Sequence, residues 1–250
     1  MNKFIQQDLT PDIVKTDNPR IGLIALSTDF TIEQDFRNIC HHNPVDIFVN
    51  RIPFENPLNH KNYLKMADHI SEVSSQILPS EDIDIVAYGC TSGTIAIGAD
   101  RIKEEVNKAK PKAKVTTPIT AAMKAFNHLG LKKIAVLTPY PKDVNATVYN
   151  YLIDNNINVE SFSSFNLEYD SEIAQVSLAS LEKEISKIDL SNVDGLFVSC
   201  TALKIVDVLD RVESSQNTVV ISSNQAIIWD CLRSVGIDSK IKGYGKLFLN

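Results

Sequence analysis

The sequence predicts an α/β fold built from two similar halves, and three observations support this prediction. Short apolar runs typical of buried strands alternate with longer segments whose apolar residues recur every three or four positions. The chain of 250 residues is longer than most single domains, and its 44% hydrophobic and 22% charged residues are an ordinary globular composition. Two stretches of the first half also recur, in the same order, in the second half. Strands that alternate with helices favour crossover connections and mainly parallel sheets.

The first half begins with a polar, aperiodic stretch and continues with alternating strands and helices. Thr31 and Gln34 have the spacing of a capping box, which predicts that a helix begins there. Between residues 61 and 78, apolar side chains recur at spacings of three and four, as in an amphipathic helix. The expected strands are 20–27, 45–52, 83–88 and 115–117, and the expected helices are 31–42, 61–78 and 95–106.

The second half has the same alternation. Its first expected helix is closed by Gly130, because glycine tolerates the left-handed conformation that ends many helices. The expected strands are 133–138, 157–165, 193–199 and 218–221, and the expected helices are 119–129, 144–153, 172–188, 203–212 and 225–235.

An internal repeat sets the expected domain organisation. The segment from Ile83 to Thr91 resembles the segment from Val193 to Thr201, since in each an Asp precedes an apolar strand that ends in Cys-Thr. The opening strands of the two halves repeat in the same register. We therefore expect two pseudo-symmetric Rossmann-like domains, residues 19–118 and 119–235, with the active site between them. Residues 1–18 are expected to form an arm, and residues 236–250 a tail that packs back on the N-terminal domain.

Composition excludes several classes of partner. Lys and Arg number 25 against 31 Asp and Glu, so the net charge of −6 disfavours nucleic-acid binding. No apolar run is long enough to span a bilayer, and the N-terminus lacks the apolar segment of a signal peptide. Four cysteines are too few for a disulfide scaffold. We expect a cytoplasmic protein with free thiols and a small-molecule substrate, and the sequence leaves a homo-oligomer open.

The two Cys-Thr motifs are the strongest candidates for chemistry. Cys90 and Cys200 each follow a strand and precede a helix, and ligands of parallel sheets bind at this edge. A helix N-terminus favours an anion, so we expect these thiols to have a lowered pKa. Thr91, Ser92 and Thr201 add hydroxyl groups beside the two sulfurs.

Two thiols that face each other across a cleft can perform isomerase chemistry. One thiolate removes a substrate proton while the other thiol delivers one to the opposite face, which is two-base racemisation. Alternatively, a thiolate adds to an activated double bond, and rotation followed by elimination isomerises that bond. Neither reaction needs a metal or an organic cofactor, and the spacing of Cys and His residues fits no zinc motif. Cys40 and Cys231 lie inside expected helices without flanking donors, and we interpret them as buried, space-filling residues.

Five segments, in this order, carry a resemblance to a known family. They are IGLIALSTDFTIEQDF (21–36), YGCTSGT (88–94), VLTPY (136–140), VSCTALK (198–204) and ISSNQAIIW (221–229). Over residues 20–248 the chain resembles the aspartate/glutamate racemase superfamily, and within it the branch of maleate isomerases and arylmalonate decarboxylases. It is also similar to the ectoine-utilisation proteins of that branch.

The resemblance implies roles for several residues. Cys90 matches the cysteine that attacks the double bond in maleate isomerases, and Cys200 matches its acid/base partner. Tyr140 matches a tyrosine that hydrogen-bonds a substrate carboxylate, although the sequence alone would make it a loop aromatic between two prolines. Thr91 and Ser92 match the pocket that holds carboxylate oxygens.

The expected function is therefore cofactor-independent isomerisation or racemisation of a small carboxylic or amino-acid-like substrate. Arylmalonate decarboxylases keep only the second-half cysteine, whereas this chain has both, which favours an isomerase. A decarboxylase of that type and a non-enzymatic small-molecule binder are the alternatives.

One position departs from the family pattern. Maleate isomerases have an Asn that helps to hold a substrate carboxylate where this chain has Asp29. An ionised Asp cannot donate a hydrogen bond, and like charges about 4 Å apart repel by about 4 kcal/mol at an effective dielectric near 20. Asp29 thus disfavours maleate and favours a substrate with an ammonium or amide N–H group. In the alternative interpretation Asp29, with Glu33 and Asp35, complements a helix N-terminus, and both interpretations stay open.

Overall fold

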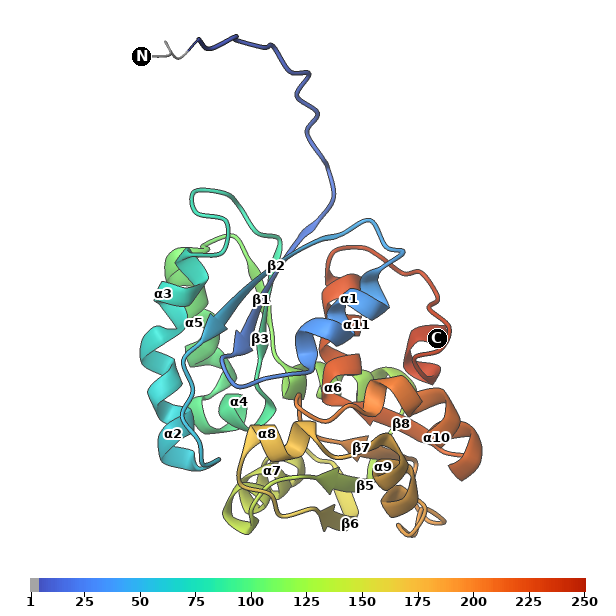
Figure 1. Cartoon of the computed structure of the whole chain (residues 1–250). Helices are drawn as coiled ribbons and strands as arrows, with labels where there is room; N and C mark the ends of the chain where they lie inside the picture. The colour runs from blue at the N-terminus through green and yellow to red at the C-terminus, as the bar shows by residue number, and fades with distance from the viewer. Residues whose placement is uncertain (1–4) are drawn as a thin grey trace.

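Two four-stranded parallel sheets form the framework of the protein (Figure 1). The structure is a computed structural model and describes residues 5–250. The strand orders are β2-β1-β3-β4 in the first sheet and β6-β5-β7-β8 in the second, so the two halves share one topology. This repeat confirms the predicted α/β fold class.

The first sheet is covered by helices on both faces. In Figure 1, α3 and α5 lie on one side of it and α1 and α11 on the other. The strands of the first half are β1 (Arg20–Leu26), β2 (Asp46–Ile52), β3 (Ile85–Gly89) and β4 (Lys114–Thr116). Its helices are α1 (Ile32–Cys40), α2 (His60–Lys65), η1 (Met66–His69), α3 (Ile70–Ser75), α4 (Thr91–Ile97) and α5 (Ala99–Ala109).

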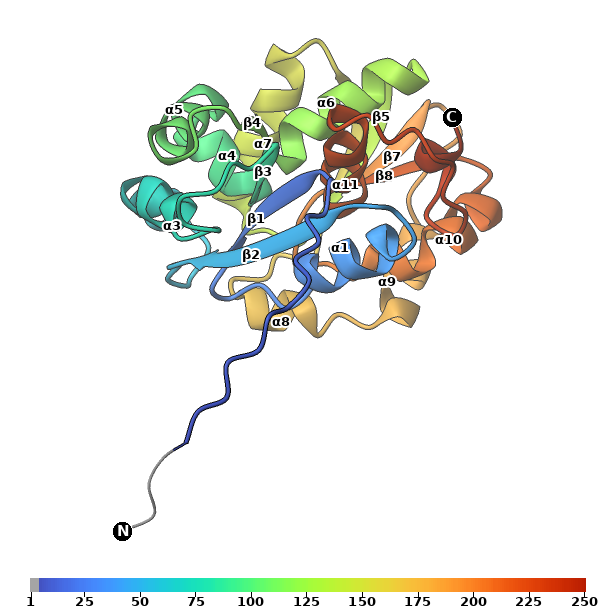
Figure 2. The same cartoon turned by 90° about the horizontal axis from the view of Figure 1, so that it is seen from above.

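The second sheet lies beside the first and repeats its layout (Figure 2). Its strands are β5 (Lys133–Thr138), β6 (Asn158–Ser164), β7 (Gly195–Val198) and β8 (Val219–Ser222). Its helices are α6 (Pro118–Leu129), α7 (Lys142–Asp154), α8 (Asp170–Ala174), α9 (Leu178–Ile185), η2 (Ile205–Val208), α10 (Leu209–Gln216), α11 (Ser223–Ser234) and η3 (Lys246–Leu249).

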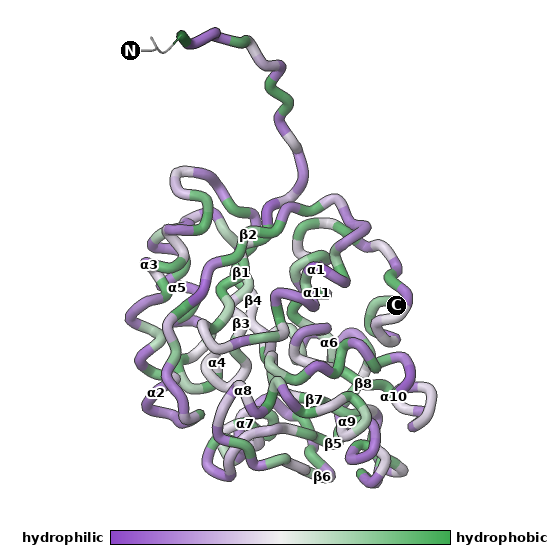
Figure 3. Tube along the Cα trace, in the orientation of Figure 1, coloured by the Kyte–Doolittle hydropathy of each residue, from purple (hydrophilic) through white to green (hydrophobic). Residues whose placement is uncertain are grey.

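Helices α6 and α11 join the two halves. Each follows the last strand of its half, and the two pack against each other. Asp230 of α11 is buried and accepts hydrogen bonds from Thr116 Oγ1 at 2.5 Å and from Lys124 Nζ at 2.7 Å. Apolar side chains of both sheets form one continuous core, while the outer helices alternate hydrophobic and hydrophilic residues (Figure 3).

Four predicted helices are interrupted, among them the one expected over 203–212, which is η2 and α10. The helix expected over 61–78 is α2, η1 and α3, and the one expected over 172–188 is α8 and α9. The helix expected over 95–106 begins earlier, as α4, and breaks at Gly98 before α5 starts. Gly98 has a φ of +93°, which glycine adopts without the steric cost of a side chain.

The predicted capping box at Thr31 is wrong. Thr31 precedes α1, but its side chain makes no capping hydrogen bond. Its hydroxyl instead donates to the carbonyl oxygen of Ala202 in the other half, at 2.9 Å. Asp29 takes over the capping role, because its Oδ1 accepts the backbone N–H groups of Thr31 at 2.7 Å and Ile32 at 2.9 Å.

The two ends of the chain are placed differently. The described part of the N-terminal arm extends away from the body (Figure 2), and Asn18 holds its base through a hydrogen bond to Asp46. The C-terminal tail makes most of its hydrogen bonds with the second half, including one from the Gly245 N–H to Asp210. Ser239 of the tail also donates to Asn43 in the first half. The division into domains at the expected boundaries stays a prediction.

Among residues 5–250 there is no helix with both the length and the apolar character needed to cross a membrane.

Candidate active site

A small cavity lies between the two halves, where the carboxyl ends of their sheets meet. The space between its atoms is about 270 Å³, but only about 10 Å³ of it can take the centre of a water-sized sphere, so the cavity is nearly closed, and every side chain that lines it is buried. The structure brings all seven residues expected from the sequence into this cavity: Asp29, Cys90, Thr91, Ser92, Tyr140, Cys200 and Thr201. Four further residues complete the lining, namely Leu26, Leu58, Tyr63 and Asp170.

Cys90 connects strand β3 to helix α4. It is the N-cap residue of α4, and its Sγ accepts the backbone N–H of Gly93 at 3.2 Å. A Cβ atom on Gly93 would lie only 2.7 Å from that sulfur. The absence of a side chain at Gly93 therefore lets the helix backbone approach the thiol closely.

Cys200 occupies the equivalent position after β7, in a strained backbone conformation. Its φ is +153°, which is rare for a residue with a side chain. Such strain persists only where surrounding contacts enforce it, and it concentrates at functional sites. The Cys200 N–H donates to Ser223 Oγ at 3.0 Å, and the Ala202 N–H donates to Cys200 Sγ at 3.4 Å.

Polar contacts hold the two cysteine loops together. The Thr91 hydroxyl donates to Ser223 Oγ at 2.9 Å, so its proton points to the other half. The Asn224 side-chain amide donates to the carbonyl oxygen of Thr201 at 2.8 Å and to Asp35 Oδ2 at 2.7 Å. Ser223 and Asn224 were not among the expected site residues, and both act from behind the cavity wall.

Two carboxyl groups face the cavity, and burial raises the pKa of each. For Asp29, hydrogen bonds from the N–H groups of Thr31 and Ile32 partly oppose this rise in pKa. The pKa of Asp170 rises to about 6, because burial and the charge of Asp29 outweigh the hydrogen bond that Thr28 donates. Asp29 thus serves both of the interpretations left open by the sequence, since it caps α1 and also lines the cavity.

The pKa values of both thiols are raised, contrary to the expected lowering. Burial raises the pKa of Cys90 to about 12, although the Gly93 N–H and the Ser92 hydroxyl oppose the rise. Burial and the charge of Asp170 also raise the pKa of Cys200, against hydrogen bonds from Ala202 and Tyr140. Desolvation therefore outweighs the favourable field of the helix N-terminus.

The remaining cysteines have the structural role that the sequence indicated. Cys40 and Cys231 are free and buried, and both belong to the hydrophobic core. Burial raises the pKa of Cys40 to about 12 and that of Cys231 well above its usual value. Neither lines the cavity.

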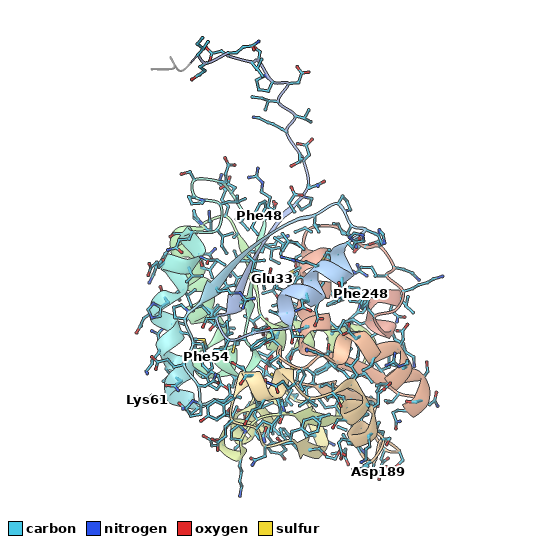
Figure 4. All side chains as sticks on the ribbon, viewed as in Figure 1. Glu33, Phe48, Phe54, Lys61, Asp189 and Phe248 are labelled. Atoms are coloured by element: carbon cyan, nitrogen blue, oxygen red, sulfur yellow. The ribbon has the colours of Figure 1, made fainter. Side chains whose placement is uncertain are left out.

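Tyr63 and Asp170 are the polar lining residues that the sequence did not reveal. Tyr63 lies on α2 and stacks on Phe54, with ring centroids 5.5 Å apart; Phe54 is labelled in Figure 4. The Tyr63 hydroxyl is buried and has no hydrogen-bond partner within the described part of the chain. Asp170 is the first residue of α8, and only the packing of that short helix against the first half brings it to the cysteines.

Comparison with known proteins places this geometry in a family. The family model described as arylmalonate decarboxylase matches residues 56–248. Maleate isomerase of Geobacillus stearothermophilus is 23% identical over 241 residues, which are 91% of this chain and 96% of that protein. Arylmalonate decarboxylase of Bordetella bronchiseptica is 30% identical over 142 residues, 53% of this chain and 57% of that protein.

Solved structures share the fold. The crystal structure of the maleate isomerase Iso from Pseudomonas putida matches with a TM-score of 0.85 at 20% identity, over 93% of this chain and 98% of that one. A mutant of the Nocardia farcinica maleate cis-trans isomerase, with a covalently bound succinylcysteine intermediate, also matches with a TM-score of 0.85, at 18% identity over 92% and 98% of the two chains. Since the family model covers most of the sequence, the chain belongs to the arylmalonate decarboxylase family.

Proposed function

We propose that the protein is a cofactor-independent isomerase or racemase that acts on a small carboxylic or amino-acid-like substrate through Cys90 and Cys200. One observation carries this proposal: cysteines at equivalent positions of the two halves line the same buried cavity. The maleate isomerases among the relatives support the reaction class. The Nocardia farcinica enzyme supports covalent chemistry at a cysteine, because a succinylcysteine forms in it.

The donors around each sulfur suit a pair of thiols that exchange one proton. The Gly93 N–H and the Ser92 hydroxyl stabilise a thiolate at Cys90, and the Ala202 N–H and Tyr140 do so at Cys200. In racemisation the thiolate takes the α-proton of the substrate and becomes a thiol. The opposite thiol gives its proton to the other face of the carbon and becomes the thiolate, so charge and protons balance.

Double-bond isomerisation uses the same groups in another order. The Cys90 thiolate adds to one alkene carbon while the Cys200 thiol protonates the next carbon. Rotation about the new single bond and elimination of the Cys90 thiolate return the proton to Cys200 and release the isomer. Burial raises the pKa of Tyr140 well above its usual value, so its hydroxyl is neutral, and its single proton can be donated to a substrate carboxylate while Cys200 is a thiol.

Decarboxylation of a malonate-like acid is the second candidate, favoured by the family model and by the Bordetella bronchiseptica relative. In that reaction only Cys200 is needed, to protonate the carbanion left after carbon dioxide departs. We also propose a cytoplasmic location, which four free, buried thiols support. The small size of the cavity supports a small-molecule substrate. We propose neither a nucleic-acid nor a membrane partner, and leave a homo-oligomer open.

Proton NMR in heavy water tests the proposal. Wild type, Cys90→Ala and Cys200→Ala are incubated with maleate, with phenylmalonate and with both enantiomers of several amino acids, and Cys231→Ala is the buried-cysteine control. We expect cis–trans conversion or loss of an α-proton signal that requires both Cys90 and Cys200. Activity on phenylmalonate that survives in Cys90→Ala would replace the isomerase with the decarboxylase. Turnover that survives the loss of either cysteine would refute both candidates.

A further inference from the structure

The charge of the cavity points to the chemical class of the substrate. We propose that Asp29 and Asp170 together bind a cationic ammonium group, so that the substrate is an α-amino acid with a free amino group rather than a dicarboxylate such as maleate. This inference rests on the proposed cysteine-pair function and specifies its substrate.

The two carboxyl groups come from segments that are far apart in the sequence and meet where Thr28 contacts Asp170. Asp29 follows strand β1, and its Oδ1 is fixed by the N–H groups of Thr31 and Ile32 at 2.7 and 2.9 Å. Asp170 begins helix α8, and its Oδ2 accepts a hydrogen bond from the Thr28 hydroxyl. Both carboxyl groups are buried, and the Thr201 hydroxyl also contacts Asp29. The contact with Thr28 leaves Oδ1 of Asp170 unoccupied.

No cationic side chain balances these carboxylates inside the cavity. The eleven lining residues include neither Lys nor Arg nor His. Arg51 approaches Asp29, but its Nη1 donates to the carbonyl oxygens of Leu26 and Asp29, at 3.0 and 2.8 Å. Its Nη2 pairs with Glu33 at 3.0 Å. The Arg51 guanidinium therefore already has its hydrogen-bond partners and does not line the cavity. The charge of Arg51 offsets that of Asp29 only in part, so the two carboxylates would repel a dianionic ligand and attract an ammonium group.

Neutral donors remain for the carboxylate of an amino acid. The buried Tyr63 hydroxyl has no hydrogen-bond partner in the described residues. Buried polar groups are nearly always hydrogen-bonded, so a ligand or a water is expected to bind this hydroxyl. Burial raises the pKa values of Tyr63 and Tyr140 well above the usual value, so both hydroxyls are neutral donors. The cavity thus offers carboxylates for an ammonium group and hydroxyls for a carboxylate, which is the pattern that a zwitterion requires.

The same arrangement explains how the thiols become active. Burial is the main cause of the raised pKa values of Cys90 and Cys200, and the charges of Asp170 and Asp29 add to it. A bound ammonium group offsets part of this field, which favours the release of one thiol proton to solvent and leaves a thiolate opposite a thiol. One thiolate then removes the α-proton of the amino acid, and the other thiol protonates the opposite face. No oxidant or co-reactant is consumed.

Neutral, isosteric variants test the role of the carboxylates. Wild type, Asp170→Asn and Asp29→Asn are compared with Asp189→Asn, an exposed control far from the cavity (Figure 4). Thermal-shift titration and α-proton exchange in heavy water are measured with α-amino acids, with the corresponding acids that lack the amino group, and with maleate and succinate. Melting curves show which variants fold, and Asp170→Asn retains the Asp29 cap of α1.

We expect wild type to bind and exchange only the ligands that carry an ammonium group. Asp170→Asn should lower kcat/KM for amino acids by roughly 100-fold, as expected when one partner of a buried charge pair is removed. It should also strengthen maleate binding relative to wild type, whereas Asp189→Asn should change neither.

Three outcomes would overturn the inference. They are the binding of no ammonium-bearing ligand, equal binding of amino acids and of their amino-free counterparts, and maleate turnover by wild type that Asp170→Asn does not improve. After any of these outcomes, the proposed catalytic role of Cys90 and Cys200 is still supported if Cys90→Ala and Cys200→Ala abolish turnover. Turnover that survives in both cysteine variants would instead refute the proposed function, whatever ligand is bound.

Discussion

Ser223 Oγ accepts the backbone N–H of Cys200 at 3.0 Å, and the same oxygen accepts the hydroxyl of Thr91 at 2.9 Å. Thr91 and Cys200 belong to different halves of the chain, and Ser223 is the first residue of α11. One buried oxygen therefore sets the position of both cysteine loops and holds the strained backbone of Cys200.

Replacing Ser223 with Ala should lower both activity and stability. The Cys200 N–H and the Thr91 hydroxyl would lose their acceptor, and an unsatisfied buried donor costs about 1–3 kcal/mol. The distance between the two thiols would also be set less firmly, so we expect kcat to fall by about 10-fold or more. Steady-state kinetics and thermal unfolding measure the two effects, with Ser234→Ala at the far end of α11 as the control. Wild-type kcat in Ser223→Ala would contradict this role.

Gly93→Ala should impair the Cys90 thiol specifically. The new Cβ would lie 2.7 Å from Cys90 Sγ and 2.6 Å from Met66 Cε, closer than non-bonded carbon atoms allow. The methionine can move aside, but the sulfur can move only by leaving its position in the cavity. We expect kcat to fall by at least 10-fold while the protein stays folded. Gly22→Ala, whose Cβ would make contacts of 3.4 Å at closest, is the matched control in kinetic and unfolding measurements.

The cysteine pair could be predicted from the sequence because strand ends and an internal repeat are local signals. Cys90 and Cys200 each follow a recognisable strand, and parallel strands present their carboxyl ends at one edge. Ser92 lies close to Cys90 in the sequence, whereas Asp29 and Tyr140 became candidates only through the resemblance to maleate isomerases. The fold class followed equally from the alternation of strands and helices.

The residues that escaped prediction depend on contacts between distant segments. Asp170 reaches the cavity only because the short helix α8 docks on the first half, where Thr28 meets it. Thr31 has the sequence of a cap, but the Ala202 carbonyl of the other half competes for its hydroxyl. The raised pKa values of the two thiols were also unpredictable, since they result mainly from burial rather than from neighbours in sequence.

The folded protein should show no thiolate at rest near neutral pH. Burial raises the pKa values of all four cysteines, to about 12 for both Cys40 and Cys90. Absorbance at 240 nm, which reports thiolate, should therefore stay flat between pH 6 and 9 in the native protein and rise after unfolding. Comparison with Cys90→Ala and Cys200→Ala assigns any change in absorbance to one of these two thiols. A titration step below pH 9 that disappears in either variant would show that the resting site already holds a thiolate.

Asp35 should make the protein less stable as the pH rises. It is buried, and burial together with the charges of Asp207 and Asp29 raises its pKa to about 8, although the Asn224 amide donates to it. Between about pH 4 and pH 8 the unfolded chain releases this proton while the folded protein keeps it, so the free energy of unfolding falls with increasing pH. Asp35→Asn cannot ionise and still offers an amide oxygen to Asn224.

The Tm of Asp35→Asn minus that of wild type should therefore increase from pH 4 to pH 8 and stay constant above pH 8. One unit of pKa shift corresponds to about 1.4 kcal/mol, and 1 kcal/mol to about 2–4 °C in the Tm of a protein of this size. The measurement is the difference between the two Tm values across this pH range, because groups that do not interact with Asp35, such as Asp170, affect both proteins alike. Asp68→Asn, at an exposed carboxylate, should leave the slope of wild type unchanged. A constant difference between Asp35→Asn and wild type would mean that Asp35 is ionised in the folded protein, paired with the Asn224 amide as an anion.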